Sequence, residues 1–220
     1  MQKFISRGFG LLFFLGILYA SYLLILLSLP YVHFEPNIEF LRTKQLIYHI
    51  DIWRWSFYIH VFTSPLVIIS GLLQFNKTLI SKRTKIHRIL GYIYILDILV
   101  ITGPAAFVMS LYANGSYPAQ VSFTLLSSLW IIFTFLGYFF VRKKDFIRHG
   151  NWLLRSYALT LSAVTLRLYA YLFDVFNLSI GPIETYILLA YTSWIPNLII
   201  AEILIRTGFI KKRFAARLTS

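Results

Sequence analysis

Six apolar stretches, each long enough to cross a lipid bilayer, leave this chain few folds to adopt. About 20 apolar residues in a helix span the ~30 Å hydrocarbon core. Six segments meet this length: residues 8–30, 55–75, 89–112, 121–141, 150–173 and 185–205. Inside a bilayer the backbone polar groups must be satisfied within the protein, and a helix does so with its own bonds. We therefore expect an all-α, polytopic membrane helix bundle that forms one domain over residues 1–220.

The positions of the basic residues predict the orientation of this bundle. Lys and Arg are retained in cytoplasmic loops during membrane insertion. Most of the 21 Lys and Arg residues lie in the segments 3–7, 77–88, 142–148 and 206–217, which fall at alternate ends of successive spans. The loops on the other side contain only Arg42, Lys44 and Arg54. Both termini are therefore expected in the cytoplasm.

Charge and composition exclude several functions. A net charge of +13 in a soluble chain would indicate nucleic-acid binding. Here the excess charge lies beside the spans, where topology and anionic headgroups account for it, so the expected partner is the lipid bilayer and not nucleic acid. The chain has no cysteine, which excludes disulfides, thiolate metal sites and iron–sulfur clusters. Any cofactor must be held by His, carboxylate or backbone groups.

His87 and His149 are the strongest candidates for a cofactor site. Each follows a basic run and opens a span, so two parallel helices present an imidazole at about the same depth. Two facing imidazoles can be the axial ligands of one haem b, and the histidines are metal ligands only in this sense. The adjacent Arg88 and Arg148 could pair with the haem propionates.

Two further residues extend this candidate haem site. Gly91 lies one helical turn after His87 and lacks a side chain that would keep a flat macrocycle away. Trp152, three residues after His149, could stack on the macrocycle. The alternative interpretation is that both histidines are ordinary helix starts at the membrane surface, bonded to water and headgroups.

His60 differs from these two because it lies inside the second span, with Gln74 on the same helical stripe. Spans two and three resemble spans four and five, which indicates a weak duplication. His60 precedes His87 by 27 residues, yet the residue 27 before His149 is Ser122. A symmetric pair of haems would need a histidine at that position, so the sequence permits at most one well-ligated haem.

Four other polar residues within the spans complete a predicted polar core: Asp97, Arg155, Asn197 and Glu202. A charge inside the bilayer is costly, so such residues usually pair or line a cavity. Arg155 and Glu202 are at similar depth and could pair, although Glu202 could instead pair with Arg206 one turn on. Asp97 and Asn197 both fall near the midplane, where they are expected to form a polar site.

The residues also resemble a known family. The resemblance rests on His60, Pro65, Gly71, Gln74, Arg83, the run His87-Arg88-Ile89-Leu90-Gly91-Tyr92, Arg148-His149, Trp152, the run from Arg155 to Thr160, and Leu166-Arg167-Leu168. In these motifs the chain resembles a bacterial membrane-protein family known as domain of unknown function 2306. The resemblance implies a multi-pass protein of a bacterial cytoplasmic membrane and brings no activity with it.

A looser resemblance concerns transmembrane di-haem cytochromes b, which also combine an in-span His, a Gly, a basic loop and a His-headed next helix. Ser122 departs from that pattern. The leading hypothesis is a redox role in which the core holds one haem b or a quinone-like partner. The competing hypothesis is a non-redox transporter or membrane assembly factor, with a buried polar path and proton-gating histidines. The sequence names no small-molecule or electron-transfer partner, and whether the chain is an enzyme stays open.

Overall fold

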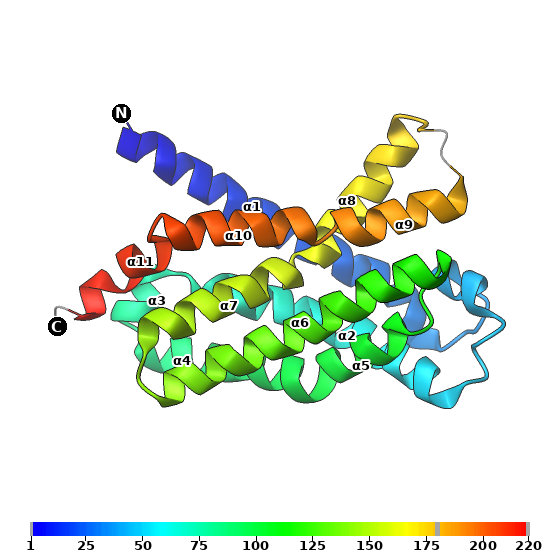
Figure 1. Ribbon diagram of the computed structural model, residues 1–220, viewed down its shortest axis with the longest axis horizontal. Helices are drawn as coiled ribbons and strands as arrows, with labels where there is room; N and C mark the ends of the chain where they lie inside the picture. Colours follow the sequence, from blue (N-terminus) through cyan, green and yellow to red (C-terminus); the bar gives the residue numbers. More distant parts are fainter. Residues whose placement is uncertain (1, 179–180, 219–220) are drawn as a thin grey trace.

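The computed structural model describes residues 2–178 and 181–218, and within these ranges every regular element is helical (Figure 1). The elements are α1 (Gln2–Ser28), η1 (Leu29–His33), η2 (Glu39–Lys44), α2 (Asp51–Gln74), α3 (Lys77–Ser81), α4 (Thr84–Leu96), η3 (Asp97–Ile101), α5 (Thr102–Ser110), α6 (Ser116–Arg142), α7 (Phe146–Thr160), α8 (Ser162–Val175), α9 (Pro182–Thr192), α10 (Ile195–Arg206) and α11 (Phe209–Leu218). The side chains of Lys3, Arg7 and Arg217, which contribute to the predicted orientation, lie outside the described side chains.

Among the described residues, six helical stretches are long and apolar enough to cross a membrane, which confirms the expected polytopic all-α fold. They are Gly10–His33, Asp51–Gln74, Thr84–Ser110, Ser116–Arg142, Phe146–Val175 and Pro182–Arg206. The third consists of α4, η3 and α5, the fifth of α7 and α8, and the sixth of α9 and α10. Helix α1 begins and α11 ends at the same end of the molecule (Figure 1), as an even number of spans requires.

Spans two to five form a four-helix core. Helix α2 packs along α4 and α5, α5 packs on α6, and α6 packs along α7, which returns to α2. Helices α4 and α7 therefore stand at opposite corners of the core. The interior is filled by fully buried apolar side chains such as Val67, Ile98 and Leu159. Helices α1, α8, α9 and α10 lie outside this core. Helix α8, the second half of the fifth span, rises away from it, whereas α9 returns and packs on α6 (Figure 1).

Three spans, the third, the fifth and the sixth, are interrupted near the middle. In the sixth span, polar side chains bond to the backbone at the interruption. Pro196 lacks the N–H that would continue the helical ladder between α9 and α10. At this break the carbonyl of Ser193 accepts bonds from Thr165 Oγ1 at 2.5 Å and from Asn197 Nδ2 at 3.1 Å. In the third span the N–H of Thr102 reaches back five residues to the carbonyl of Asp97, which makes the π-turn η3. Such single π-turns often occur at functional positions of helices.

The segment between the first two spans folds as a cap over the end of the bundle. Its side chains Leu41 and Lys44 are buried, and Leu41 packs with Trp53 and Phe57 at the start of α2. The Lys44 ammonium donates to the carbonyl of Tyr112 at 2.5 Å and lies 5.5 Å from the centre of the Phe40 ring. Burial away from water lowers the pKa of Lys44 from 10.5 to about 8.

This cap predicts a pH-dependent stability. The unfolded chain holds the Lys44 proton up to pH 10.5, whereas the folded chain releases it near pH 8, so the unfolded state binds more protons between these values. Stability should therefore rise with pH across this window, by on the order of 1 to 3 kcal/mol. Thermal unfolding of detergent-purified protein from pH 7 to pH 10 measures the effect.

The matched comparison is with Lys44→Met, which keeps an unbranched apolar chain and removes the titrating amine. Its unfolding midpoint should lack the part of the pH slope that Lys44 contributes. Lys143→Met, at an exposed position at the other end of the bundle, should keep the wild-type slope. Identical slopes for wild type and Lys44→Met would contradict the assignment.

Candidate functional site

The end of the core at which α2 ends and α4 and α7 begin, named here the basic end, contains both candidate haem ligands. His149 lies in the first turn of α7 and is 8% exposed. Its Nδ1 lies 2.8 Å from the carbonyl oxygen of Gly137 on α6, so Nδ1 carries the proton and donates. The lone pair of this imidazole is then on Nε2.

His87 occupies the equivalent position on α4 and is also 8% exposed. The side-chain amide of Gln74, oriented to satisfy its neighbours, donates to His87 Nδ1 at 3.1 Å and to the His87 carbonyl at 3.2 Å. Its oxygen accepts from the N–H of Gly91 at 3.1 Å. A Cβ on Gly91 would lie 3.2 Å from the Gln74 amide group, so the space above Gly91 receives this amide.

The neighbouring residues of the predicted haem site point in several directions. Arg88 is exposed, and Arg148 forms an ion pair with Asp145 at 3.4 Å. The Trp152 ring packs against Phe133 with centroids 5.3 Å apart. The Arg155 guanidinium lies 4.5 Å from the centre of the Trp152 ring. Trp152 thus belongs to the contact between α6 and α7 and to the Arg155 cluster.

A group of buried polar side chains in the middle of the core was not predicted from the sequence. This hydroxyl cluster consists of Tyr94, Trp130, Thr134, Ser156 and Thr160. The Tyr94 hydroxyl lies 2.8 Å from Ser156 Oγ and 2.9 Å from Thr160 Oγ1. Trp130 Nε1 donates to Thr160 Oγ1 at 2.9 Å, and Thr134 Oγ1 lies 2.7 Å from Ser156 Oγ. These hydrogen bonds connect α4, α6 and α7 and so fix the positions of the three helices relative to one another.

A second polar chain lies in the other half of the core, around Asp97. The Asp97 carboxylate accepts from Thr102 Oγ1, which is also hydrogen-bonded to Thr63 Oγ1 on α2. Asp97 and Thr102 are both buried. His60 stands three residues before Thr63 on α2, and its Nδ1 is buried with no hydrogen-bond partner within the described part of the chain. Asp97 therefore belongs to a hydrogen-bonded polar chain that connects η3 to α2.

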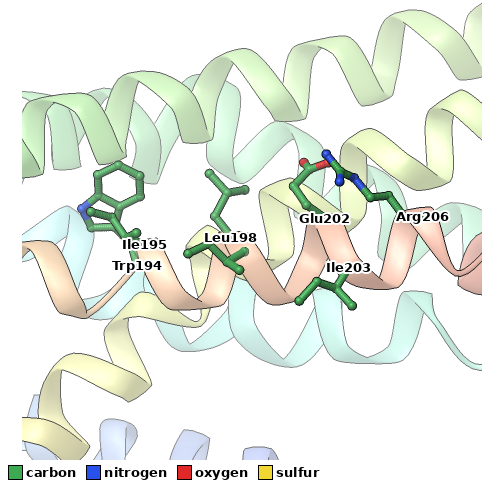
Figure 2. Close-up of a pocket in the computed structure, with 7 residues that line it drawn as sticks. Trp194, Ile195, Leu198, Glu202, Ile203 and Arg206 are labelled. Carbon is green, nitrogen blue, oxygen red and sulfur yellow. The ribbon is translucent and has the colours of Figure 1, made fainter.

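Arg155 and Glu202 join α7 to α10 by a bidentate ion pair. Nε of Arg155 contacts one carboxylate oxygen, and Nη2 donates to the other at 2.9 Å. Of the two pairings that the sequence allows, this is the one between spans five and six. Figure 2 shows Glu202 and Arg206 extending from the same side of α10, at one end of a row of apolar side chains.

Asn197 and Ser122 each have partners of their own. Asn197 Nδ2 donates to Thr165 Oγ1 at 3.1 Å and to the Ala158 carbonyl at 3.3 Å, so it lies between α10 and the fifth span. The expected midplane site shared with Asp97 is not formed by any hydrogen bond among the described residues. Ser122 donates to the Ala190 carbonyl at 2.9 Å and accepts from Trp194 Nε1 at 3.0 Å, which connects α6 to the sixth span.

Six apolar spans around a core with buried polar clusters define a polytopic integral membrane protein. The model of the family described as predicted membrane protein (DUF2306) matches residues 57–205, about two thirds of the 220 residues. The chain belongs to this family, as the motifs indicated. The family description assigns a membrane protein and no activity. No curated protein and no solved structure matches the chain.

Proposed function

We propose that this protein has a redox role in the membrane and holds one haem b between His87 and His149. The observation that carries the proposal is the burial of both imidazoles at the basic end of the core, on helices at opposite corners. His149 donates through Nδ1 to the Gly137 carbonyl on a neighbouring helix, which is how metal-bound histidines are commonly oriented, whereas His87 accepts at Nδ1 from Gln74. Among the described residues, no group of three or more His, Asp or Glu offers another metal site.

The fit of haem differs between the two histidines. His149 has the tautomer that can bind iron through Nε2, because its Nδ1 carries the proton and donates to the Gly137 carbonyl. His87 accepts from the Gln74 amide at Nδ1, which puts the ring proton on Nε2. To bind iron, His87 requires the Gln74 amide to turn so that its oxygen accepts from Nδ1–H. Gln74 would then give up its two bonds to the backbone of α4, one with the His87 carbonyl and one with the Gly91 N–H.

When bound, a haem b with two imidazole ligands supplies one-electron transfer. The residues of the chain would hold and tune it. The Gly137 carbonyl and the Gln74 side chain would fix the two rings, and the exposed Arg88 and Arg148 would reach the propionates. A quinone-like partner in place of haem would use the same pair differently, with His87 Nε2–H as donor and His149 Nε2 as acceptor.

An absorption spectrum of the detergent-purified full-length protein tests this proposal. Haem between the two histidines should give a Soret band and, after reduction, the sharp α band of a low-spin b-type haem. The protein should be expressed with haem precursor in excess, so that supply does not limit loading. A colourless protein that is fully folded by circular dichroism under these conditions would contradict haem binding.

A second candidate, a non-redox transporter or assembly factor, is favoured by a separate observation. The buried Asp97 and Thr102 form a hydrogen-bonded chain with the half-buried Thr63, and the hydroxyl cluster begins at Tyr94, three residues before Asp97 on the same span. Hydroxyl groups both donate and accept, so such a chain can pass a proton to a carboxylate. In this case Asp97→Asn should abolish proton-coupled activity in a colourless protein.

We also propose that the protein lies in the cytoplasmic membrane of a bacterium with its basic end in the cytoplasm. The support is the concentration of Lys and Arg in the loops at that end. Reporter fusions test this orientation. A fusion at Lys144, between α6 and α7, should be cytoplasmic, and a fusion at Gly115, before α6, should lie outside. The opposite result at both positions would reverse the orientation, and the same side for both would contradict six spans.

A further inference from the structure

A groove along α10 combines an apolar floor with a charged end. Its lining residues are Trp194, Ile195, Leu198, Ile199, Glu202, Ile203 and Arg206, and its volume is about 350 Å³ (Figure 2). The side chains of Ile195, Ile199 and Ile203 are 37%, 54% and 55% exposed, so the groove opens outward from the bundle. Because α10 belongs to a membrane span, this opening faces lipid.

The length of the groove matches one leaflet of a bilayer. From Ile195 to Arg206 the helix rises roughly 16 Å at 1.5 Å per residue. Half of a ~30 Å hydrocarbon core is about 15 Å. Arg206 is at the basic end, so the apolar part of the groove runs from the headgroup level to about the midplane. An acyl chain of a single lipid can lie along it.

The charges at the end of the groove favour an anion. The Glu202 carboxylate is already bound on both oxygens by Arg155, so this ion pair is neutral as a unit. Arg206 then adds a positive charge at the mouth. The exposed Lys211 and Lys212 follow on α11, which packs against α10, α3 and α7. Basic pockets between spans are typical sites for anionic lipid headgroups.

We propose that the groove along α10 binds an anionic phospholipid, with one acyl chain on Leu198 and Ile199 and the phosphate on Arg206. Arg206 presents a planar group of several donors, which suits a phosphate better than a single ammonium does. The lipid joins α10 and α11 to the four-helix core at the basic end. This site is separate from the histidine pair and does not depend on haem.

The experiment titrates phosphatidylglycerol into the detergent-purified full-length protein and follows the thermal unfolding midpoint. Phosphatidylglycerol should raise the midpoint, and phosphatidylcholine, which has the same chains and a neutral headgroup, should raise it much less. Arg206→Gln should weaken the apparent affinity for phosphatidylglycerol about fivefold, the effect expected of one basic residue at an anionic headgroup. Arg142→Gln, at an exposed position on α6 at the same end, should leave it unchanged.

A second pair of variants tests the apolar part. Ile199→Trp fills the groove and keeps all charges, so it should reduce the effect of phosphatidylglycerol, whereas Ile132→Trp on the outer face of α6 should not. Equal effects of the two lipids on the wild type, or an unchanged affinity in both Arg206→Gln and Ile199→Trp, would overturn the proposal. An equal stabilisation by inorganic phosphate alone would also overturn it, because the site would then bind free anions.

Discussion

Replacing either His87 or His149 with Ala is expected to abolish the low-spin b-type spectrum of this protein, whereas His60→Ala should leave it intact. A six-coordinate haem needs both imidazoles, and each ring is buried at the basic end of the core. His60 stands in the other half, beside Thr63 and η3, where it cannot share a ligand set with them. The measurement is the reduced-minus-oxidised difference spectrum at matched protein concentration.

Two controls separate ligation from folding. Adding imidazole to His149→Ala should restore part of the spectrum if the variant still folds. Gln74→Glu supplies a carboxylate that accepts from His87 Nδ1–H, which favours the lone pair on Nε2 and makes the ligand more basic. This variant should keep the haem and lower its reduction potential. A spectrum that survives in both alanine variants would exclude the histidine pair as ligands.

The overall architecture could be predicted because a bilayer leaves few alternatives. Apolar length alone identified all six spans, and the depth of Arg155 and Glu202 along their helices indicated their pairing. Both features depend on distance along a helix axis, which sequence numbering gives directly. The sequence also singled out the histidine pair by its position at the starts of two spans, and its role as a cofactor site stays a prediction.

The direction of a side chain around its helix was harder to predict. Gln74 was grouped with His60 because both lie on one stripe of α2, but 14 residues separate them along the helix. The rise of 1.5 Å per residue places them roughly 21 Å apart, at opposite ends of the span. Gln74 bonds instead to the neighbouring α4, through His87 and Gly91. A shared stripe therefore indicates a shared face and says nothing of depth.

The hydroxyl cluster had no signal in the sequence. Ser and Thr in apolar helices commonly bond to a carbonyl of their own helix, as Ser21 does to Ile17 and Thr192 to Leu188. Thr134 bonds to the Trp130 carbonyl of its own helix in the same way, and nothing in the residue type indicates that Thr134 and Ser156 also bond to each other across helices. Only the close packing of α6 on α7 determines which hydroxyls meet. The interruption of the fifth span at Leu161 could not be predicted either, because no proline or glycine lies there.

The second large effect is expected at the ion pair between α7 and α10. Glu202→Leu alone should destabilise the protein by ~3 to 5 kcal/mol, because Arg155 would keep a charge inside the bilayer with only the Trp152 ring beside it. Arg155→Met should have a smaller effect, since Arg206 extends toward the abandoned Glu202 carboxylate (Figure 2). Denaturant titration in mixed micelles measures the free energy of unfolding of each variant.

The double variant Arg155→Met/Glu202→Leu decides between two explanations of this pair. If the two residues serve mainly to neutralise each other, replacing both by apolar side chains should be much milder than replacing Glu202 alone. Arg54→Met breaks the surface pair with Asp51 and should change stability by less than about 1 kcal/mol, because Asp51 is 75% exposed. If the double variant is as unstable as Glu202→Leu, the pair must hold α10 against the core by its specific geometry. The loss of the bidentate contact would then loosen the sixth span, and with it the groove in which we place the lipid.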